Sequence, residues 1–406
     1  MSPTKSKDAT SLVILRAGVE AGTLKRTRDG CVFKFNQQFL ESKKFKGLSF
    51  RMRKTTNEFL VQGTNLHPFF AGLLPEGLRL KALVGQLKTS QDDLFSLFAA
   101  VGSHVIGDVQ VQERLRDQKK ILPPKLKEVD FDLYLEKILK MNSYARGEDA
   151  ISGVQEKISA SMIHFPLNIA GQQTMSLVKL NPPDKKNLVE NEFFCMKLAE
   201  KCGIAVPKVK FVKDGKGKLG LLVERFDRTW DGQKRTFKML HQEDACQFLD
   251  LYPADKYRVP FSDIAKEIKN LVPAASVTLL KLLRIYSYSY LIGNGDLHAK
   301  NISLLVSERG FIDLSPAYDL ICTSIYGDVK MALKFDGKDD NLKRKSILQF
   351  GERLGIPSLA LEKMLDQLLK DFEKYNALLG RIPMENKTRK LFWTLVKKRT
   401  RDLAAT

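Results

Sequence analysis

The sequence predicts an α+β protein in which a mixed, β-rich N-terminal part precedes one large all-helical C-terminal lobe. Near the N-terminus, short stretches such as SLVILR and CVFKF are rich in β-branched, aromatic and alternating apolar residues, which favours strands. In the second half of the chain, long segments repeat apolar residues every three to four positions, the spacing of an amphipathic helix. The dipeptide Pro123–Pro124 lies in a lysine-rich stretch (117–130) that is the clearest domain boundary.

The elements expected in the first 230 residues are bounded by Gly, Pro and Asn. Before the boundary we expect strands within 11–35 and 48–62, the second region including LSFRM and FLVQ, then helices after Pro75 and over 90–102. After it we expect strands over 157–165 and 174–180, a helix over 190–204, and a hairpin of 205–212 with 218–226. The helices expected beyond them span 241–249, 261–272, 276–294, 344–356, 358–380 and 385–403.

The composition restricts the class of protein. Of the 406 residues, 67 are Lys or Arg and 47 are Asp or Glu, so the formal net charge is +20. This charge excludes an acidic, solvating chain and favours acidic partners such as nucleic acid or nucleotide phosphates. The five cysteines are scattered without a C-x-x-C pair, so neither a zinc ribbon nor a disulfide framework is predicted. No apolar run reaches the length of a signal-peptide core or a membrane span, and we expect a reduced, cytoplasmic protein.

The segment GKGKLG (215–220) satisfies the G-x-G-x-x-G pattern of dinucleotide-binding loops. That pattern binds phosphate only where it opens a helix, because the helix N-terminus supplies the amide donors. Here the apolar strand LLVERF follows, so we interpret the glycines as a hairpin turn. The sequence also contains no G-x-x-x-x-G-K-[ST] motif, which argues against a P-loop NTPase.

The segment GNGDLHAKNIS (293–303) carries the strongest chemical signal. Asp296 and Asn301 have the D-x-x-x-x-N spacing of a protein-kinase catalytic loop. In such a loop the Asp orients a substrate hydroxyl and accepts its proton, while the Asn oxygen turns toward a metal bound to nucleotide phosphates. Lys300 is suitably placed to contact the transferred phosphoryl group, whereas His298 is expected to be an orienting or packed side chain.

Two other features fit the same chemistry. Asp319 ends a short apolar hairpin, where kinases hold Mg²⁺; a turn-capping carboxylate is the alternative. Lys179 lies in the strand MSLVKL, and Glu192, or else Glu190, begins the next helix, as in the lysine–glutamate pair of phosphoryl transferases. The alternative for Lys179 is an edge-strand lysine that reaches solvent. The strand LLVERF would then form the connection between the lobes. In kinases the backbone of this connection contacts the adenine ring of ATP.

These residues resemble a known family, the HipA-type serine/threonine kinases, which are the toxin halves of bacterial toxin–antitoxin pairs. The matching segments are HPFFAGLLPEG (67–77), FSLFAAVGSHVIGDVQV (95–111), ISGVQEK (151–157), NEFFCMKLAEKCGIAVP (191–207), LVERFDR (222–228), HQEDACQ (241–247), NGDLHAKNIS (294–303) and SPAYDL (315–320). The resemblance implies a protein-kinase-like bilobal fold. It also implies a division into an N-terminal subdomain (1–116), a connecting segment (117–144), a small-lobe core (145–228) and a helical C-lobe (229–406).

The resemblance assigns roles to individual positions. Asp296 corresponds to the catalytic aspartate, and Asn301 and Asp319 to the Mg²⁺ ligands. The residues implied in ATP binding are Lys179 with Glu192, the loop residues Gly153, Val154, Gln155 and Lys157, and the connection Glu224, Arg225 and Phe226. The kinase positions are all occupied, so we expect an active enzyme that uses ATP and Mg²⁺.

One position departs from the family pattern. Many members carry a serine whose autophosphorylation ejects the ATP loop, and here that position is Ala150. We hypothesise that autophosphorylation has moved to Ser152, two residues later. A phosphate on Ser152 would repel the ATP phosphates and so switch the kinase off. The alternatives are that autoregulation is lost, or that Ser152 simply makes a hydrogen bond in a turn.

The resemblance implies a toxin that phosphorylates Ser or Thr of a translation component, such as an aminoacyl-tRNA synthetase, and so causes growth arrest and persistence. A DNA-binding helix-turn-helix antitoxin (HipB-like) would neutralise it and bring it to operator DNA. The alternatives are a small-molecule kinase and a non-catalytic co-repressor bound to DNA with the antitoxin. The basic segments 41–54 and 386–401 could contact nucleic acid, although solvated lysine faces are the default interpretation.

Overall fold

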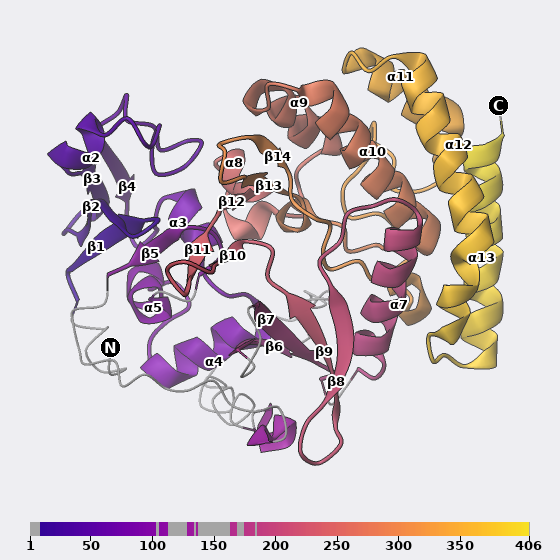
Figure 1. Ribbon diagram of the computed structural model, residues 1–406, viewed down its shortest axis with the longest axis horizontal. Helices are drawn as coiled ribbons and strands as arrows, with labels where there is room; N and C mark the ends of the chain where they lie inside the picture. The colour runs from indigo at the N-terminus through magenta and orange to yellow at the C-terminus, as the bar shows by residue number, and fades with distance from the viewer. Residues whose placement is uncertain are drawn as a thin grey trace.

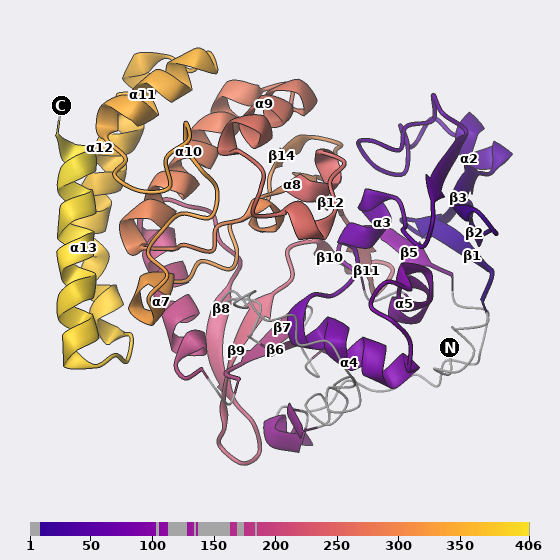
Figure 2. The same cartoon turned by 180° about the vertical axis from the view of Figure 1, so that it is seen from behind.

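The computed structural model describes residues 9–102, 105–112, 128–133, 135–136, 163–168, 174–182 and 185–405. The expected ATP loop (Gly153, Val154, Gln155 and Lys157), Ser152 and most of the connecting segment 117–144 lie outside these residues. In two opposite views, the N-terminal domain and the C-terminal helices lie at opposite ends of the molecule, with the small-lobe sheet between them (Figures 1 and 2). The expected α+β, kinase-like bilobal fold is confirmed.

The N-terminal domain is an antiparallel five-stranded sheet covered by short helices. Its strand order is β4-β3-β2-β1-β5, from Glu58–Gln62, Gly30–Phe35, Val19–Arg26, Ser11–Arg16 and Val109–Val111. The helices are α2 (Gln37–Glu41), α3 (Pro68–Gly72), α4 (Gly77–Leu87) and α5 (Leu94–Val101). Phenylalanines dominate the core, and rings such as Phe33, Phe70 and Phe98 are almost fully buried and in mutual contact.

The strand predicted at LSFRM is wrong. Residues 48–52 form bends, with one isolated bridge from Gly47 to Arg53, and only β4 joins the sheet. The Ser49 hydroxyl accepts hydrogen bonds from the backbone N–H groups of Arg51 (3.2 Å) and Met52 (2.8 Å). Such local side-chain bonds compete with a strand ladder, while Leu48 and Met52 still bury their side chains in the core.

The small lobe is a second antiparallel sheet with one helix packed on it. Its order is β6-β7-β9-β8, from Ile163–Asn168, Met175–Leu180, Leu219–Glu224 and Val209–Lys213. The predicted hairpin of β8 and β9 is confirmed, and the GKGKLG segment forms its turn. Asp214 closes this turn by accepting hydrogen bonds from the N–H groups of Lys216 (2.9 Å) and Lys218 (2.8 Å), and Gly217 has a φ of +84°.

The helix of the small lobe, α7 (Leu188–Lys201), contacts three strands of this sheet. Phe193 stacks at 4.0 Å between ring centroids on Phe211 of β8, which fixes the helix against the sheet. Cys195 is fully buried and, like the other four cysteines, is a free thiol, so no disulfide constrains this helix.

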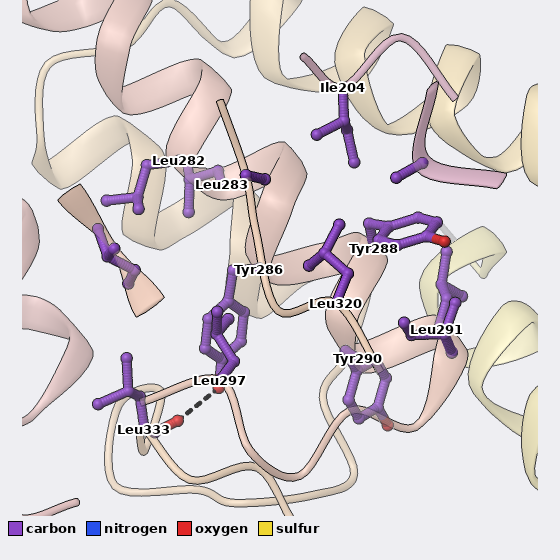
Figure 3. Packing of buried hydrophobic residues seen from close by; sticks show 14 of the residues in the cluster. Ile204, Leu282, Leu283, Tyr286, Tyr288, Tyr290, Leu291, Leu297, Leu320 and Leu333 are labelled. Atoms are coloured by element: carbon purple, nitrogen blue, oxygen red, sulfur yellow. Dashed lines mark hydrogen bonds between the residues drawn. The ribbon is translucent and has the colours of Figure 1, made fainter. Parts of the chain in front are cut away.

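The C-terminal lobe is built around α10 (Ala275–Ile292). It is surrounded by α9 (Phe261–Leu271), α11 (Arg344–Arg353), α12 (Ser358–Tyr375) and α13 (Asn386–Ala404), which confirms the five long predicted helices. Tyr286, Tyr288 and Tyr290 of α10 are fully buried among leucines (Figure 3). Each hydroxyl has a backbone partner: Tyr286 donates to Leu333 O (2.7 Å), Tyr288 donates to Cys195 O (2.5 Å), and Tyr290 accepts from Leu342 N (3.2 Å). These bonds allow the tyrosine-rich C-terminal half of the helix to be buried, whereas Val277 and Lys281 nearer its N-terminus are exposed.

The C-terminal lobe is not all-helical, which corrects the prediction. It contains a three-stranded sheet of β12 (His241–Asp244), β13 (Ser303–Val306) and β14 (Ile312–Leu314), preceded by a hairpin of β10 (Arg228–Asp231) and β11 (Thr236–Met239). The helix predicted over 241–249 is therefore divided into β12 and the short α8 (Ala245–Phe248). Asp244 makes this division because its side chain caps α8 in a capping box with Gln247.

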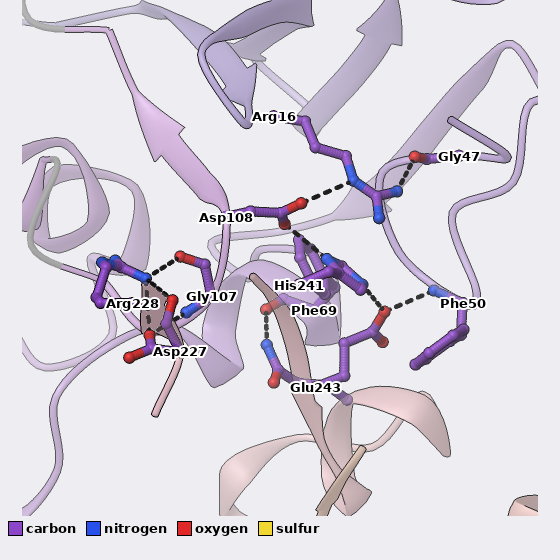
Figure 4. A network of polar contacts seen from close by, with 11 residues as sticks. Arg16, Gly47, Phe50, Phe69, Gly107, Asp108, Asp227, Arg228, His241 and Glu243 are labelled. Carbon is purple, nitrogen blue, oxygen red and sulfur yellow. Dashed lines mark hydrogen bonds and ion pairs between the residues drawn. The ribbon is translucent and has the colours of Figure 1, made fainter. Parts of the chain in front are cut away.

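A buried charge network joins the N-terminal domain to β12 (Figure 4). His241 lies between two carboxylates, with Nδ1 2.6 Å from Asp108 Oδ1 and Nε2 2.7 Å from Glu243 Oε1. Arg16 contacts the other oxygen of Asp108 at 3.3 Å, and Glu243 also accepts from Phe50 N at 2.7 Å. Burial and Arg16 lower the pKa of His241, but its bonds to the two carboxylates outweigh them and raise it overall. The imidazole is therefore a charged bridge between the two domains.

Within the described residues, no helix combines the length and the apolar character that crossing a membrane requires.

Candidate active site

The predicted catalytic loop begins where α10 ends. Gly293 caps the helix in the left-handed conformation (φ +73°), and the Asn294 side chain then accepts from the N–H of Asp296 at 3.0 Å. Asn301 donates from Nδ2 to the carbonyl oxygen of Asp296 at 3.0 Å, which closes the loop. The D-x-x-x-x-N spacing thus places the Asn301 side chain beside the backbone of Asp296. The Asp296 residue is fully buried.

The carboxylate of Asp296 has a partner that the sequence did not indicate. The hydroxyl of Tyr257 donates to Asp296 Oδ1 at 2.9 Å. The Tyr257 ring also meets His298 edge-on, with centroids 5.0 Å apart and an interplanar angle of 76°. Burial lowers the pKa of His298 well below its usual value, so this ring is neutral, which agrees with the expected packed or orienting role.

Lys179 lies at the centre of the small-lobe contribution. Its ammonium contacts both oxygens of Glu192, at 2.7 and 3.0 Å, so the strand-lysine and helix-glutamate pair is confirmed. Glu190, the alternative partner, instead accepts from Asn181 at 3.2 Å. Strand β7 lies between β6 and β9, and Lys179 is only 9% exposed, so the alternative of a solvent-reaching edge lysine is wrong.

Asp319 contacts Lys179 across the lobes. The two side chains come from positions 140 residues apart, and Asp319 Oδ1 bonds the lysine ammonium directly. Asp319 adopts a left-handed backbone conformation (φ +54°), which Asp tolerates better than most residues. The neighbouring Tyr318 holds this segment against the catalytic loop, because its hydroxyl donates to Lys300 O at 2.6 Å.

The Lys179 cluster has one positive and two negative groups in a buried place. Burial lowers the pKa of Lys179, but Asp319 and Glu192 more than offset this and raise it, so the ammonium stays charged. For Glu192, burial and the Asp319 charge outweigh the attraction of Lys179 and raise the pKa to about 7. Two carboxylates therefore share one charged ammonium, and Glu192 is the one that takes up a proton more easily than usual.

The predicted lobe connection follows β9. The Arg225 side chain binds Asp227 two residues later (2.6 Å) and reaches the N-terminal domain at Val105 O (3.0 Å). Glu224 donates its backbone N–H to Lys208 O at 2.9 Å. The Phe226 ring lies 5.8 Å from that of Tyr318, so the connection runs beside the segment that carries Asp319.

Lys300 is buried and held by two groups outside the Lys179 cluster. Its ammonium bonds Asp244 Oδ2 at 2.5 Å and the carbonyl oxygen of Gly72 at 3.0 Å. Contact between Lys300 and a transferred phosphoryl group therefore stays a prediction, and its observed partners lie on β12 and on α3. Neither Asp244 nor Gly72 could be found from a motif, because both meet Lys300 only through tertiary packing.

The side chains of Asn301 and Asp319 fit the expected metal. Both offer hard oxygen donors, which Mg²⁺ prefers in proteins. Among the described residues no group of three or more His, Cys, Asp or Glu side chains forms a metal cage. Magnesium in phosphoryl transferases needs only one or two protein side chains, because nucleotide phosphates complete its coordination.

Comparison with known proteins agrees with this geometry. A curated relative from Shewanella oneidensis, named serine/threonine-protein kinase toxin HipA, is 27% identical over 326 residues, which are 74% of this chain and 74% of the relative. Y4mE of Sinorhizobium fredii is 29% identical over 335 residues, 77% of this chain and 78% of its own length. A chain in the solved complex of HipA, HipB and operator DNA from Shewanella oneidensis has the same fold, with a TM-score of 0.72, 20% identity and 96% of both chains covered.

Two domain matches identify the family. Residues 12–112 match the HipA N-terminal domain, and residues 150–375 match the HipA-like C-terminal domain. Because the second match alone covers more than half of the sequence, this chain belongs to the HipA family.

Proposed function

We propose that this chain is a toxin kinase that transfers the γ-phosphate of ATP to Ser or Thr of a target protein. The observation that carries the proposal is the contact of Lys179 with both Glu192 and Asp319, which joins strand, helix and C-lobe loop as phosphoryl transferases do. The Asp296–Asn301 loop is linked to the same segment through Tyr318. The kinase name of the Shewanella relative supports the reaction type.

Each residue has a distinct role in the proposed reaction. Asp296 orients the acceptor hydroxyl and takes its proton, and Lys179, held by Glu192, binds the ATP phosphates. Asn301 and Asp319 would hold Mg²⁺, which would supply positive charge to neutralise the transferred phosphoryl group. The backbone of Glu224, Arg225 and Phe226 contacts adenine, and Gly153, Val154, Gln155 and Lys157 cover the phosphates. Lys300 stays a candidate for contact with the phosphoryl group.

The proposal extends to partners and domain limits. We propose a HipB-like helix-turn-helix antitoxin and operator DNA as partners, supported by the presence of both in the solved Shewanella complex. The target is a translation component such as an aminoacyl-tRNA synthetase, and its modification arrests growth. The subdomain limits 1–116, 117–144, 145–228 and 229–406 also remain our proposal.

The decisive experiment compares the wild type with Asp296→Asn. Purified protein, Mg²⁺ and labelled ATP are incubated with a lysate, and phosphorylated Ser and Thr peptides are identified by mass spectrometry. The wild type should label one or a few proteins and arrest growth when expressed. Asp296→Asn should lower labelling by about 10²- to 10⁴-fold, the usual contribution of a positioned acid–base group, and relieve the arrest.

Other outcomes select the alternatives. ATP consumption without a labelled protein would favour a small-molecule kinase. Growth arrest that persists in Asp296→Asn would favour the non-catalytic co-repressor. Intact-mass measurement after incubation with ATP tests autoregulation in the same samples: one added phosphate that Ser152→Ala removes supports Ser152, and a phosphate elsewhere contradicts it.

A further inference from the structure

The short segment between α8 and α9 lies directly against the catalytic loop. After the turn Pro253–Asp255, Tyr257 donates its hydroxyl hydrogen to Asp296 Oδ1 at 2.9 Å. Burial and the Asp296 charge raise the pKa of Tyr257, so the phenol stays protonated and the direction of this bond is fixed. One oxygen of the buried carboxylate is therefore held, and this sets the direction of the other.

The Tyr257 side chain is itself held in place by the same loop. Its ring meets His298 edge-on at 5.0 Å, and the preceding carbonyl, that of Lys256, accepts from Ala299 N at 3.1 Å. The segment thus contacts the loop at a side chain and at its backbone. Such double attachment restricts both the ring and the carboxylate to one orientation.

The N-terminal domain supports this segment from the other side. The Glu76 carboxylate lies 3.0 Å from the ammonium of Lys256, whose side chain is 12% exposed. Nearby, Tyr252 donates to Leu66 O at 3.0 Å, and Lys300 of the loop donates to Gly72 O at 3.0 Å. Residues 66–76 of the N-terminal domain therefore contact both the Tyr257 segment and the catalytic loop.

We propose that Tyr257 is a positioning residue that holds the carboxylate of Asp296 in its reactive orientation, and that Glu76 fixes the segment bearing Tyr257 through Lys256. The inference rests on the proposed kinase function, since it assigns Tyr257 an effect on the reaction of Asp296. The hydroxyl of Tyr257 bonds the carboxylate that is proposed to take the acceptor proton, so its loss should affect turnover more than ATP binding.

The test uses two matched substitutions that each remove one hydroxyl group. Tyr257→Phe keeps the ring against His298 and removes the bond to Asp296. Tyr252→Phe removes a bond of similar length, 3.0 Å against 2.9 Å, to the N-terminal domain and leaves the bond to Asp296 in place. The full chain is assayed by ADP release from Mg²⁺·ATP, with water or its own serines as acceptors, so no target is required. Affinity for a non-hydrolysable ATP analogue is measured in parallel.

We expect Tyr257→Phe to lower kcat about tenfold or more, with KM and analogue affinity within about twofold of the wild type, because a misdirected catalytic group loses rate without loss of binding. Tyr252→Phe should retain wild-type kcat. The inference is overturned by a kcat for Tyr257→Phe within twofold of the wild type, by an equal loss in Tyr252→Phe, or by a parallel loss of analogue affinity. A wild type that releases no ADP overturns the proposed function and this inference together.

Discussion

The catalytic loop has two neighbours that are built differently. On the small-lobe side, the described contact is a cluster in which one lysine faces the carboxylates Glu192 and Asp319. On the N-terminal side, the acidic groups are matched by cations. His241 lies between Asp108 and Glu243, and Arg16 binds Asp108. Asp227 binds Arg225 and Arg228. On the first side two carboxylates share one cation, whereas on the second side the cations are at least as many as the carboxylates.

This difference indicates a division of labour. The small-lobe contact should respond to nucleotide and metal, and its side chains should affect catalysis more than folding. The N-terminal contact should hold the two domains together, and its side chains should affect stability more than catalysis. Four substitutions or titrations test this division, beginning with the largest expected effect.

Replacing Lys179 by Met should nearly abolish phosphoryl transfer, by about 10²- to 10³-fold, because the cationic group facing the phosphates is lost. Lys208→Met is the control, because the Lys208 side chain is 88% exposed and its ion pair with Glu224 is long, at 3.9 Å. ADP release measures both. If Lys179→Met keeps more than a tenth of wild-type activity, the small-lobe cluster is structural.

Replacing His241 by Gln should destabilise the protein by about 3–5 kcal/mol, because the buried carboxylates of Asp108 and Glu243 lose their shared cation. Activity per folded molecule should change little. Lys281→Met, which removes a half-exposed ion pair with Asp313, should cost at most about 1 kcal/mol. Urea unfolding of both variants measures the two losses of stability. Equal midpoints for His241→Gln and Lys281→Met would contradict a stabilising role for the network.

The same network should make stability depend on pH. The folded state raises the pKa of His241, so its contribution is complete below the unfolded value of about 6.5 and is lost as pH rises through the folded value. For Asp108, burial raises the pKa, but His241 and Arg16 lower it to about 2, so its contribution is present above about 3.9 and is lost as pH falls toward 2.

We therefore expect the stability difference between the wild type and His241→Gln to shrink above about pH 7, by about 1.4 kcal/mol for each unit by which the pKa is raised. Urea unfolding at several pH values between about 5.5 and 9 measures it. A difference that stays constant over this range would show that folding does not shift the pKa of His241.

The smallest effect is expected for Glu76→Gln. Its carboxylate is one-third exposed, so loss of the charge should change stability by less than about 1 kcal/mol. The kcat for ADP release should fall about threefold through the looser Tyr257 segment. Glu267→Gln breaks another ion pair between the domains, to Arg51 at 3.0 Å, away from that segment, and should leave kcat unchanged. Equal effects of Glu76→Gln and Glu267→Gln on kcat would show that Glu76 only helps to hold the two domains together.

Local patterns were sufficient for part of the fold and of the site. Five long helices followed from apolar spacing, and the Lys179–Glu192 pair followed from a strand and a helix adjacent in sequence. The closed Asp296–Asn301 loop is likewise a five-residue feature. In these cases the interacting groups are close along the chain, so periodicity and spacing contain the necessary information.

Other features depend on contacts between distant segments. The split of 241–249 into β12 and α8 depends on pairing with β13, about sixty residues later in the chain. Asp319 was recognised as a candidate ligand, but its bond to Lys179 spans 140 positions. Tyr257 has no motif at all, because its importance arises from a neighbour that only the folded chain provides. Tertiary pairing overrides local preference at such places.

The bond from Lys300 to Gly72 has a consequence for engineering. Its acceptor is a main-chain carbonyl, so no substitution at position 72 removes it directly. A side chain there would still be excluded by packing, since a Cβ atom would lie 2.5 Å from Cγ of Gln247. The length of the chain between Leu66 and Glu76 therefore matters more than its composition. An inserted residue in that stretch would shift the carbonyl by several ångströms, while most exposed substitutions beside it would be tolerated.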